Sequence, residues 1–166
     1  MILPYQTIIA WAKSGGIDPF DSTLVNPASI DLRWSGRFRI ASNDELANLN
    51  GWSKEMHADR LVLAAGSFYL LDTLEYIKMP PDCAGMLALK SSMGRQGLEH
   101  LHAGFFDPNF EGTATLEVEN RHPRPLVIER EQRIIQLALM RCEEAPTVNY
   151  AQTGRYQGQR GPMRAR

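Results

Sequence analysis

Short apolar runs, separated by turn residues, fill most of the chain from residue 30 onward. In residues 30–35 apolar and polar positions alternate, which is the period-2 pattern of a half-buried strand. Gly36 interrupts this alternation before it resumes at Phe38 and Ile40. The same kind of run predicts further strands at 61–63, 68–71, 85–89, 113–118, 126–128 and 134–140. Many short strands without a strand–helix–strand rhythm predict a mostly-β barrel or sandwich.

One short helix is predicted at the N-terminus. Apolar residues at positions 5, 8, 9 and 12 recur at the spacing of one helix face. Gly15 and Gly16 provide its end, because glycine readily adopts the left-handed conformation of a helix C-cap. Residues 18–27 form an irregular connection, and residues 41–60, rich in Asn, Asp and Gly, form an excursion between strands.

Length and charge narrow the class of protein. A chain of 166 residues is long enough for one domain, residues 1–166, with a sizeable core. The net charge of −1 argues against a general nucleic-acid binder, which is normally basic. The tail, residues 145–166, carries four arginines and no acid. It is either a solvated tail or a basic segment that binds phosphates, and charge alone leaves both open.

Cysteine usage and the N-terminal residues predict the compartment. Cys83 and Cys142 stand 59 positions apart without a C-x-x-C motif, so neither a disulfide framework nor a structural zinc site is expected. The first residues lack the basic and apolar regions of a signal peptide. No apolar run approaches the ~18 residues of a membrane span. We expect a soluble, cytoplasmic protein with no membrane partner.

The predicted strand 113–118 carries the first candidate for chemistry. Positions 114, 116 and 118 share one face, and Thr115, Glu117 and Glu119 share the other. Those glutamates are either ordinary surface residues of a half-solvated strand or, at Glu117, a general acid/base in a cleft. The second role needs a carboxyl group whose pKa is raised by burial.

Two further segments carry candidate binding residues, and the first of them fits an anionic ligand. In residues 90–95, Ser91, Ser92 and Gly94 let the backbone approach a ligand, while Lys90 and Arg95 supply positive charge. The segment is not a Walker loop, because the G-x-x-x-x-G-K-[ST] spacing is absent.

The second segment is Asp107-Pro108-Asn109-Phe110. It is either an Asx-type turn with a core aromatic or a sugar site. In a sugar site, Asp107 would accept a hydrogen bond from a hydroxyl and Phe110 would pack on the sugar face. An apolar ring there would leave a ribose 2′-hydroxyl unpaired and so favour deoxyribose.

Several kinds of catalytic site are not expected. Zinc nucleobase deaminases use H-x-E followed by P-C-x-x-C, and neither motif occurs here. The four histidines do not stand at recognised metal spacings. The G-x-S-x-G of serine hydrolases is also absent. We therefore expect no protein-bound metal.

Five segments, in order, resemble the motifs of the dCTP deaminases of the dUTPase superfamily. The resemblance covers the N-terminal helix through the tail, except residues 41–60. The segments are Asn26-Pro27-Ala28-Ser29-Ile30-Asp31-Leu32-Arg33, residues 90–97, Ala103-Gly104-Phe105-Phe106-Asp107-Pro108 with Thr115-Leu116-Glu117, Arg133-Ile134-Ile135-Gln136-Leu137, and Tyr156-Gln157-Gly158-Gln159-Arg160-Gly161-Pro162.

The resemblance implies a distorted, dUTPase-like β-barrel that forms a homotrimer with active sites between subunits. The implied reaction is zinc-independent hydrolysis of dCTP to dUTP and ammonia, with Mg²⁺ bound through the substrate triphosphate. By motif position, the catalytic residues would be Glu117 as acid/base, Ser91 holding the water and Arg95 stabilising the base. The substrate-binding residues would be Asp107 and Phe110 for the deoxyribose, Tyr150, Arg155 and Gln159 for the triphosphate, and also Lys90, Ser92, Gly94, His102, Thr115 and Gln136.

One departure from the family pattern concerns the base pocket. The family commonly reads H-x-T-A-G-F, whereas this chain has His102 at the threonine position and one residue fewer between Gly97 and Asp107. A changed pocket could accept a 5-modified dCTP. Two other functions stay open: a dUTPase-like pyrophosphatase, or a bifunctional enzyme, in which Asp107 activates a water at the α-phosphate, and a non-catalytic nucleotide-binding regulator. The dUTPase C-terminal glycine-rich motif is not present.

Overall fold

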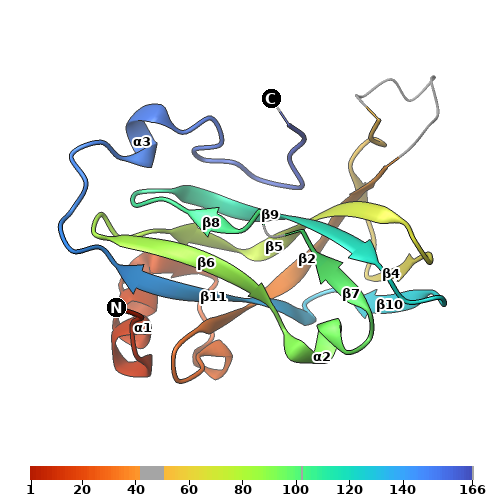
Figure 1. The fold of residues 1–166 in the computed structure, drawn as a ribbon, viewed down its shortest axis with the longest axis horizontal. Helices are drawn as coiled ribbons and strands as arrows, with labels where there is room; N and C mark the ends of the chain where they lie inside the picture. The colour runs from red at the N-terminus through yellow and green to blue at the C-terminus, as the bar shows by residue number, and fades with distance from the viewer. Residues whose placement is uncertain (42–50, 102, 166) are drawn as a thin grey trace.

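The computed structural model describes residues 1–41, 51–101 and 103–165, and it is built mainly of strands (Figure 1). The strands are β1 Ile17–Asp18, β2 Ile30–Ile40, β3 Met56–His57, β4 Arg60–Leu63, β5 Phe68–Lys78, β6 Cys83–Leu89, β7 Leu98–His100, β8 Phe105–Phe106, β9 Glu111–Asn120, β10 Leu126–Glu129 and β11 Arg133–Arg141. The helical elements are α1 Tyr5–Trp11, a π-helical turn Ala12–Gly16, a 3-10 turn Ser22–Leu24, α2 Ser91–Gly94 and α3 Tyr150–Thr153.

Nine strands form one curled sheet in the order β7-β9-β5-β2-β11-β6-β8, with β1 paired to β5 and β3 to β2. Strands β4 and β10 form a separate antiparallel pair. The register shifts between Trp34 and Phe38 in β2, around Gly36 with φ 96°, and between Asp72 and Tyr76 in β5. Such irregularities increase twist and bend a sheet. The predicted mostly-β class is confirmed, in the form of a sheet curled like half a barrel.

Alternation along the long strands places the core inside the curl. In β9 the side chains of Ala114, Leu116 and Val118 are buried, as the sequence predicts. Trp34 in β2 and Leu71 in β5 are also fully buried. The opposite face of β9 is therefore left for Thr115, Glu117 and Glu119, which are all partly exposed.

The N-terminal helix is confirmed with one difference. Ile8 and Ala12 are buried, and the left-handed Gly15 (φ 94°) lies where the helical segment ends. Tyr5, which the spacing predicts on the buried face, is 46% exposed because it is the first helical residue. No helix in the described part of the chain is long and apolar enough to cross a membrane.

Four short strands, β1, β3, β7 and β8, are absent from the sequence prediction. Each has only two or three residues, which is too few to show a period. Within the predicted excursion 41–60, residues 51–60 contain β3 and the start of β4, and residues 42–50 lie outside the described residues. The tail returns over the β8–β9 side of the sheet (Figure 1), where Gln159 forms a parallel bridge with Gly112.

Candidate active site

A pocket of about 420 Å³ lies on the partly exposed face of β9, between β5, the turn after β8 and the tail. Because Leu70 of β5 pairs directly with Glu117 of β9, both side chains project from this face. Six of the predicted site residues line the pocket and are called the pocket set here: Asp107, Phe110, Thr115, Glu117, Tyr150 and Gln159. A single chain therefore brings together residues that are up to 52 positions apart in sequence.

Glu117 has the properties expected of a general acid/base. Burial raises the pKa of its carboxyl group above the ordinary value, against a smaller lowering by a backbone hydrogen bond. Its Oε2 atom is buried and has no hydrogen-bond partner among the described residues. His100 Nε2 lies 3.9 Å from that oxygen, and the His100 side chain is 3% exposed. A carboxylate held in this way gains from taking up a proton.

The turn at Asp107 combines the two roles that the sequence leaves open. The backbone N–H of Phe110 donates to the Asp107 carbonyl at 3.1 Å, and Asn109 between them is left-handed with φ 64°. The Phe110 ring is buried, with centroids 4.8 Å from Phe106 and 5.5 Å from Tyr150. Phe110 is thus a core aromatic whose ring also reaches the pocket, while Asp107 is exposed at the pocket rim.

The tail completes the pocket. At the start of α3 the Asn149 N–H donates to the Gln152 side-chain oxygen at 3.2 Å, and the Gln152 N–H donates to the Asn149 carbonyl at 3.1 Å, which places Tyr150 in the first turn. Further along, the Gln159 side-chain amide donates to the Thr113 carbonyl at 2.7 Å. The tail therefore contributes Tyr150 and Gln159 from two separate anchor points.

The predicted residues of the 90–95 segment lie elsewhere. Lys90, Ser91, Ser92, Gly94 and Arg95, called the loop set here, surround the short helix α2, and none of them lines the pocket of this single chain. The side chain of Lys90 donates to the buried Asp31 at 2.6 Å, so within the chain it stabilises the fold. The other four residues are exposed.

Three further predicted residues also lie outside the pocket set. Gln136 in β11 accepts a hydrogen bond from Ser29 at 3.1 Å, on the sheet face that also carries Asp31. Arg155 is exposed in the tail and does not line the pocket. His102 lies outside the described residues.

The pocket residues that the sequence analysis does not assign to the site are mostly apolar. They include Trp52, Phe68, Leu70, Phe105, Phe106, Tyr156 and Met163. The Trp52 and Phe68 rings lie 5.1 Å apart at 56°. Assigning Phe68 and Leu70 to the pocket requires the pairing register of β5 with β9, and the alternation of apolar residues in β5 does not reveal that register. These side chains exclude water from the surroundings of Glu117, which explains the raised pKa.

In residues 1–41, 51–101 and 103–165, no group of three or more His, Cys, Asp or Glu side chains is placed to hold a metal ion. His100 and Glu117, 3.9 Å apart, supply only two donors.

Comparison with known proteins gives a consistent family. A family model described as "dCTP deaminase-like" matches residues 2–142. The chain is 40% identical over 180 residues to "dCTP deaminase, dUMP-forming" of Rhodococcus erythropolis, covering 98% of this chain and 94% of that protein. It is 39% identical over 184 residues to the protein of the same name from Mycobacterium tuberculosis, covering 100% and 95%.

A solved structure is similar in fold. The crystal structure of 2′-deoxycytidine 5′-triphosphate deaminase from Agrobacterium tumefaciens matches with a TM-score of 0.70 at 24% identity. The match covers 83% of this chain and 47% of that protein, so the chain spans about half of its length.

Proposed function

We propose, since the chain belongs to the dCTP deaminase-like family, that it catalyses the hydrolytic deamination of dCTP. The observation that carries this proposal is Glu117, a carboxyl group with a raised pKa and an unpartnered oxygen in a largely apolar pocket. Acid/base catalysis is most effective when the pKa of the group lies near the working pH. Burial moves the pKa of Glu117 in that direction.

The proposed reaction needs one water and no electron transfer. The Glu117 carboxylate takes a proton from water while the water oxygen bonds to C4 of cytosine. The protonated carboxyl then returns that proton to the exocyclic amine, the C4–N bond breaks, and ammonia leaves. The second water proton moves from O4 to the ring nitrogen N3, so a C4 carbonyl forms, the base becomes uracil, and Glu117 is again ionised.

The remaining pocket set fits the sugar and phosphates. We assign Asp107 and Phe110 to the deoxyribose, and Tyr150 and Gln159, with Arg155 of the tail, to the triphosphate. Mg²⁺ would enter as part of the substrate, because this ion is commonly bound through substrate phosphates with few protein ligands.

We further propose a homotrimer in which the partner subunit's loop set completes each pocket. Two observations support this arrangement: Ser91 and Arg95 are exposed and apart from Glu117, and the neighbouring sheet face is apolar. On that face Met86 and Phe105 are directly paired across β6 and β8, and they are 48% and 58% exposed. Contiguous apolar surface of this kind typically marks a protein–protein interface.

Incubation with dCTP and Mg²⁺ tests the reaction. We expect equimolar loss of dCTP and release of ammonia, with a uracil nucleotide resolved by anion-exchange chromatography. The Glu117→Gln protein serves as the control for contaminating deaminases. Intact dCTP after incubation with the trimeric wild-type protein would refute the proposal.

A second candidate function is dUMP formation. The sequence alone implies dUTP as the product, but the relatives at 39–40% identity are named dUMP-forming. In that case the site would also cleave the α–β phosphate bond, with Asp107 as the candidate to activate a water. One pyrophosphate per ammonia would establish dUMP as the product, whereas ammonia without pyrophosphate would establish dUTP. A non-catalytic regulator is disfavoured because these relatives are named as enzymes.

Mixed trimers test the shared site. We expect Glu117→Gln and Arg95→Ala proteins each to be nearly inactive alone. After dissociation and reassembly together, about a quarter of the sites would combine an intact Glu117 with a partner subunit's intact Arg95, since each is present in half of the chains. Recovery of about a quarter of wild-type activity supports the shared site, and no recovery in verified mixed trimers contradicts it.

A further inference from the structure

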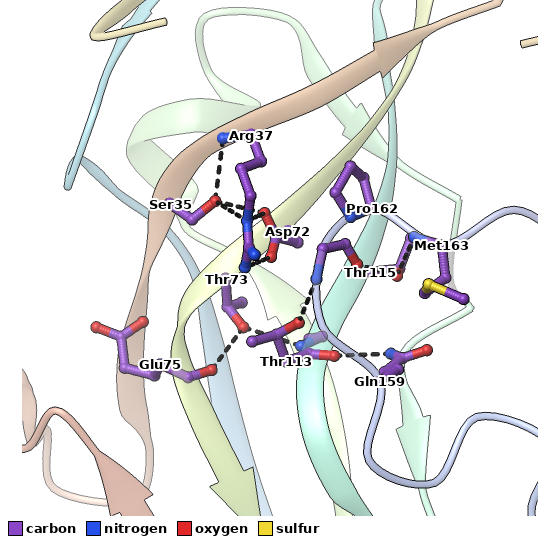
Figure 2. Close-up of polar contacts among 12 residues, drawn as sticks. Ser35, Arg37, Asp72, Thr73, Glu75, Thr113, Thr115, Gln159, Pro162 and Met163 are labelled. Carbon is purple, nitrogen blue, oxygen red and sulfur yellow. Dashed lines mark hydrogen bonds and ion pairs between the residues drawn. The ribbon is translucent and has the colours of Figure 1, made fainter. Parts of the chain in front are cut away.

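Two threonines of β9 hold the tail against the sheet (Figure 2). Thr113 makes three contacts: its N–H donates to the Gln159 carbonyl at 3.0 Å, its carbonyl accepts from the Gln159 side chain at 2.7 Å, and its Oγ1 accepts from the Gly161 N–H at 3.2 Å. Two positions further along, Thr115 Oγ1 accepts from the Met163 N–H at 3.1 Å. Both hydroxyl oxygens thus satisfy backbone donors of the tail.

A buried acid lies beneath this anchor. Asp72 is fully buried in β5, directly opposite Thr115, and pairs with Arg37 and the Ser35 hydroxyl (Figure 2). Burial raises the pKa of Asp72, while hydrogen bonds from Ser35, Arg37 and Thr113 lower it.

The anchored segment forms one wall of the pocket. Gln159, Met163 and Arg164 of the tail line the same pocket as Glu117. A further contact, from Arg39 Nε to the Pro162 carbonyl at 2.8 Å, holds the same segment. The placement of this wall therefore depends on the buried Thr113 and on the partly exposed Thr115 and Arg39.

We propose that Thr113 and Thr115 are positioning residues for the nucleotide. They act through the tail: they fix residues 159–163 so that Gln159 and its neighbours meet the bound nucleotide. This inference rests on the proposed function for its effect on dCTP, but the anchor itself is a property of the protein without substrate. It gives Thr115 a use besides the substrate contact that the family resemblance implies.

Thr73 provides a matched control. It is also a fully buried threonine, and its hydroxyl donates to the Glu75 carbonyl and accepts from the Ala114 N–H, both at 2.9 Å. Among the described residues, the Thr73 hydroxyl bonds within β5 and to β9, and neither bond reaches the tail. Thr73→Val therefore removes a buried hydroxyl of the same kind that makes no direct bond to residues 159–163.

Hydrogen–deuterium exchange of the full-length, substrate-free protein tests the anchor. In Thr113→Val we expect the backbone amides of residues 159–161 and 163 to exchange about five- to tenfold faster, the effect of one lost hydrogen bond. Thr115→Val should accelerate the same segment. Thr113→Ser, which keeps the hydroxyl, should restore wild-type exchange, and Thr73→Val should leave this segment unchanged. Equal exchange in Thr113→Val and wild type would overturn the anchor.

Steady-state kinetics with dCTP then test the positioning role. We expect KM to rise about fivefold or more in Thr113→Val with a smaller change in kcat, and Thr73→Val to keep the wild-type KM. Faster exchange together with an unchanged KM would overturn the positioning role. If wild type does not deaminate dCTP at all, the proposed function fails while the exchange result still decides the anchor.

Discussion

The pocket set and the loop set are two halves of one predicted site, and they differ in their exposure to solvent and in their position on the sheet. The pocket set is assembled within one chain around a desolvated carboxyl group, Glu117. The loop set lies around α2, at the far side of the sheet from α3 and the tail (Figure 1), and Arg95 there is solvated. Proton transfer by a carboxyl group needs a site shielded from water, and the paired strands of a single chain can provide that shielding. Charge stabilisation can come from an exposed residue, provided that a second copy delivers it.

The largest expected effect is at the centre of the pocket set. Glu117→Gln keeps the shape and most hydrogen bonding but cannot take up a proton, so kcat should fall ~10²–10⁴-fold while nucleotide binding persists. Stopped-time ammonia assays and calorimetric titration with dCTP measure the two quantities. Glu119→Gln is the matched control, because Glu119 shares this face of β9 but pairs with Arg121. Near-normal turnover of Glu117→Gln would remove Glu117 from the mechanism.

The loop set should respond nearly as strongly, without a loss of stability. Arg95→Ala should lower kcat about 10²-fold, the typical effect of removing one group that stabilises developing charge. Because Arg95 is exposed, its melting temperature should stay close to wild type. Arg121→Ala, another exposed arginine, is the control for nonspecific charge effects. If Arg95→Ala keeps full activity, the pocket set works alone and the loop set has no catalytic part.

His102 tests the segment that joins the two sets in sequence. Replacing His102 by Thr introduces the residue that is common at this position in the family, and it replaces an imidazole ring by a smaller side chain. We expect the ratios of kcat/KM among dCTP, 5-methyl-dCTP and dUTP to shift by about tenfold, a typical effect of changed pocket shape. Identical ratios in both proteins would show that this histidine does not set base specificity.

The smallest effect concerns stability, and it has a definite sign. Burial raises the pKa of Glu117 in the folded state, so the folded protein holds a proton that the unfolded chain loses. Its stabilising contribution is complete below the ordinary glutamate pKa and is lost as pH rises through the raised pKa. Glu117→Gln should therefore increase the melting temperature at pH 8 relative to wild type, and the gain should shrink at pH 4. A gain that is equal at both pH values would mean that the pKa is not raised.

The elements that could be predicted from sequence are those with a local signal. The helix at residues 5–11 and the inward face of β9 follow from the spacing of apolar residues, and both are confirmed. Strands β7 and β8 have too few residues to show a period. Trp52 gave no signal, because its role depends on stacking with Phe68, from which it is separated by β3 and β4.

The sequence by itself determined the strand-rich class, the family and the residue types available for chemistry. Only the tertiary structure decided which of those residues meet. Glu117 is a raised-pKa carboxyl group because β5 pairs with β9 and because the tail returns over both, and these contacts join distant parts of the chain. The sequence determines which titratable group a residue carries, but the pKa of that group depends on the solvent and charges around it after folding.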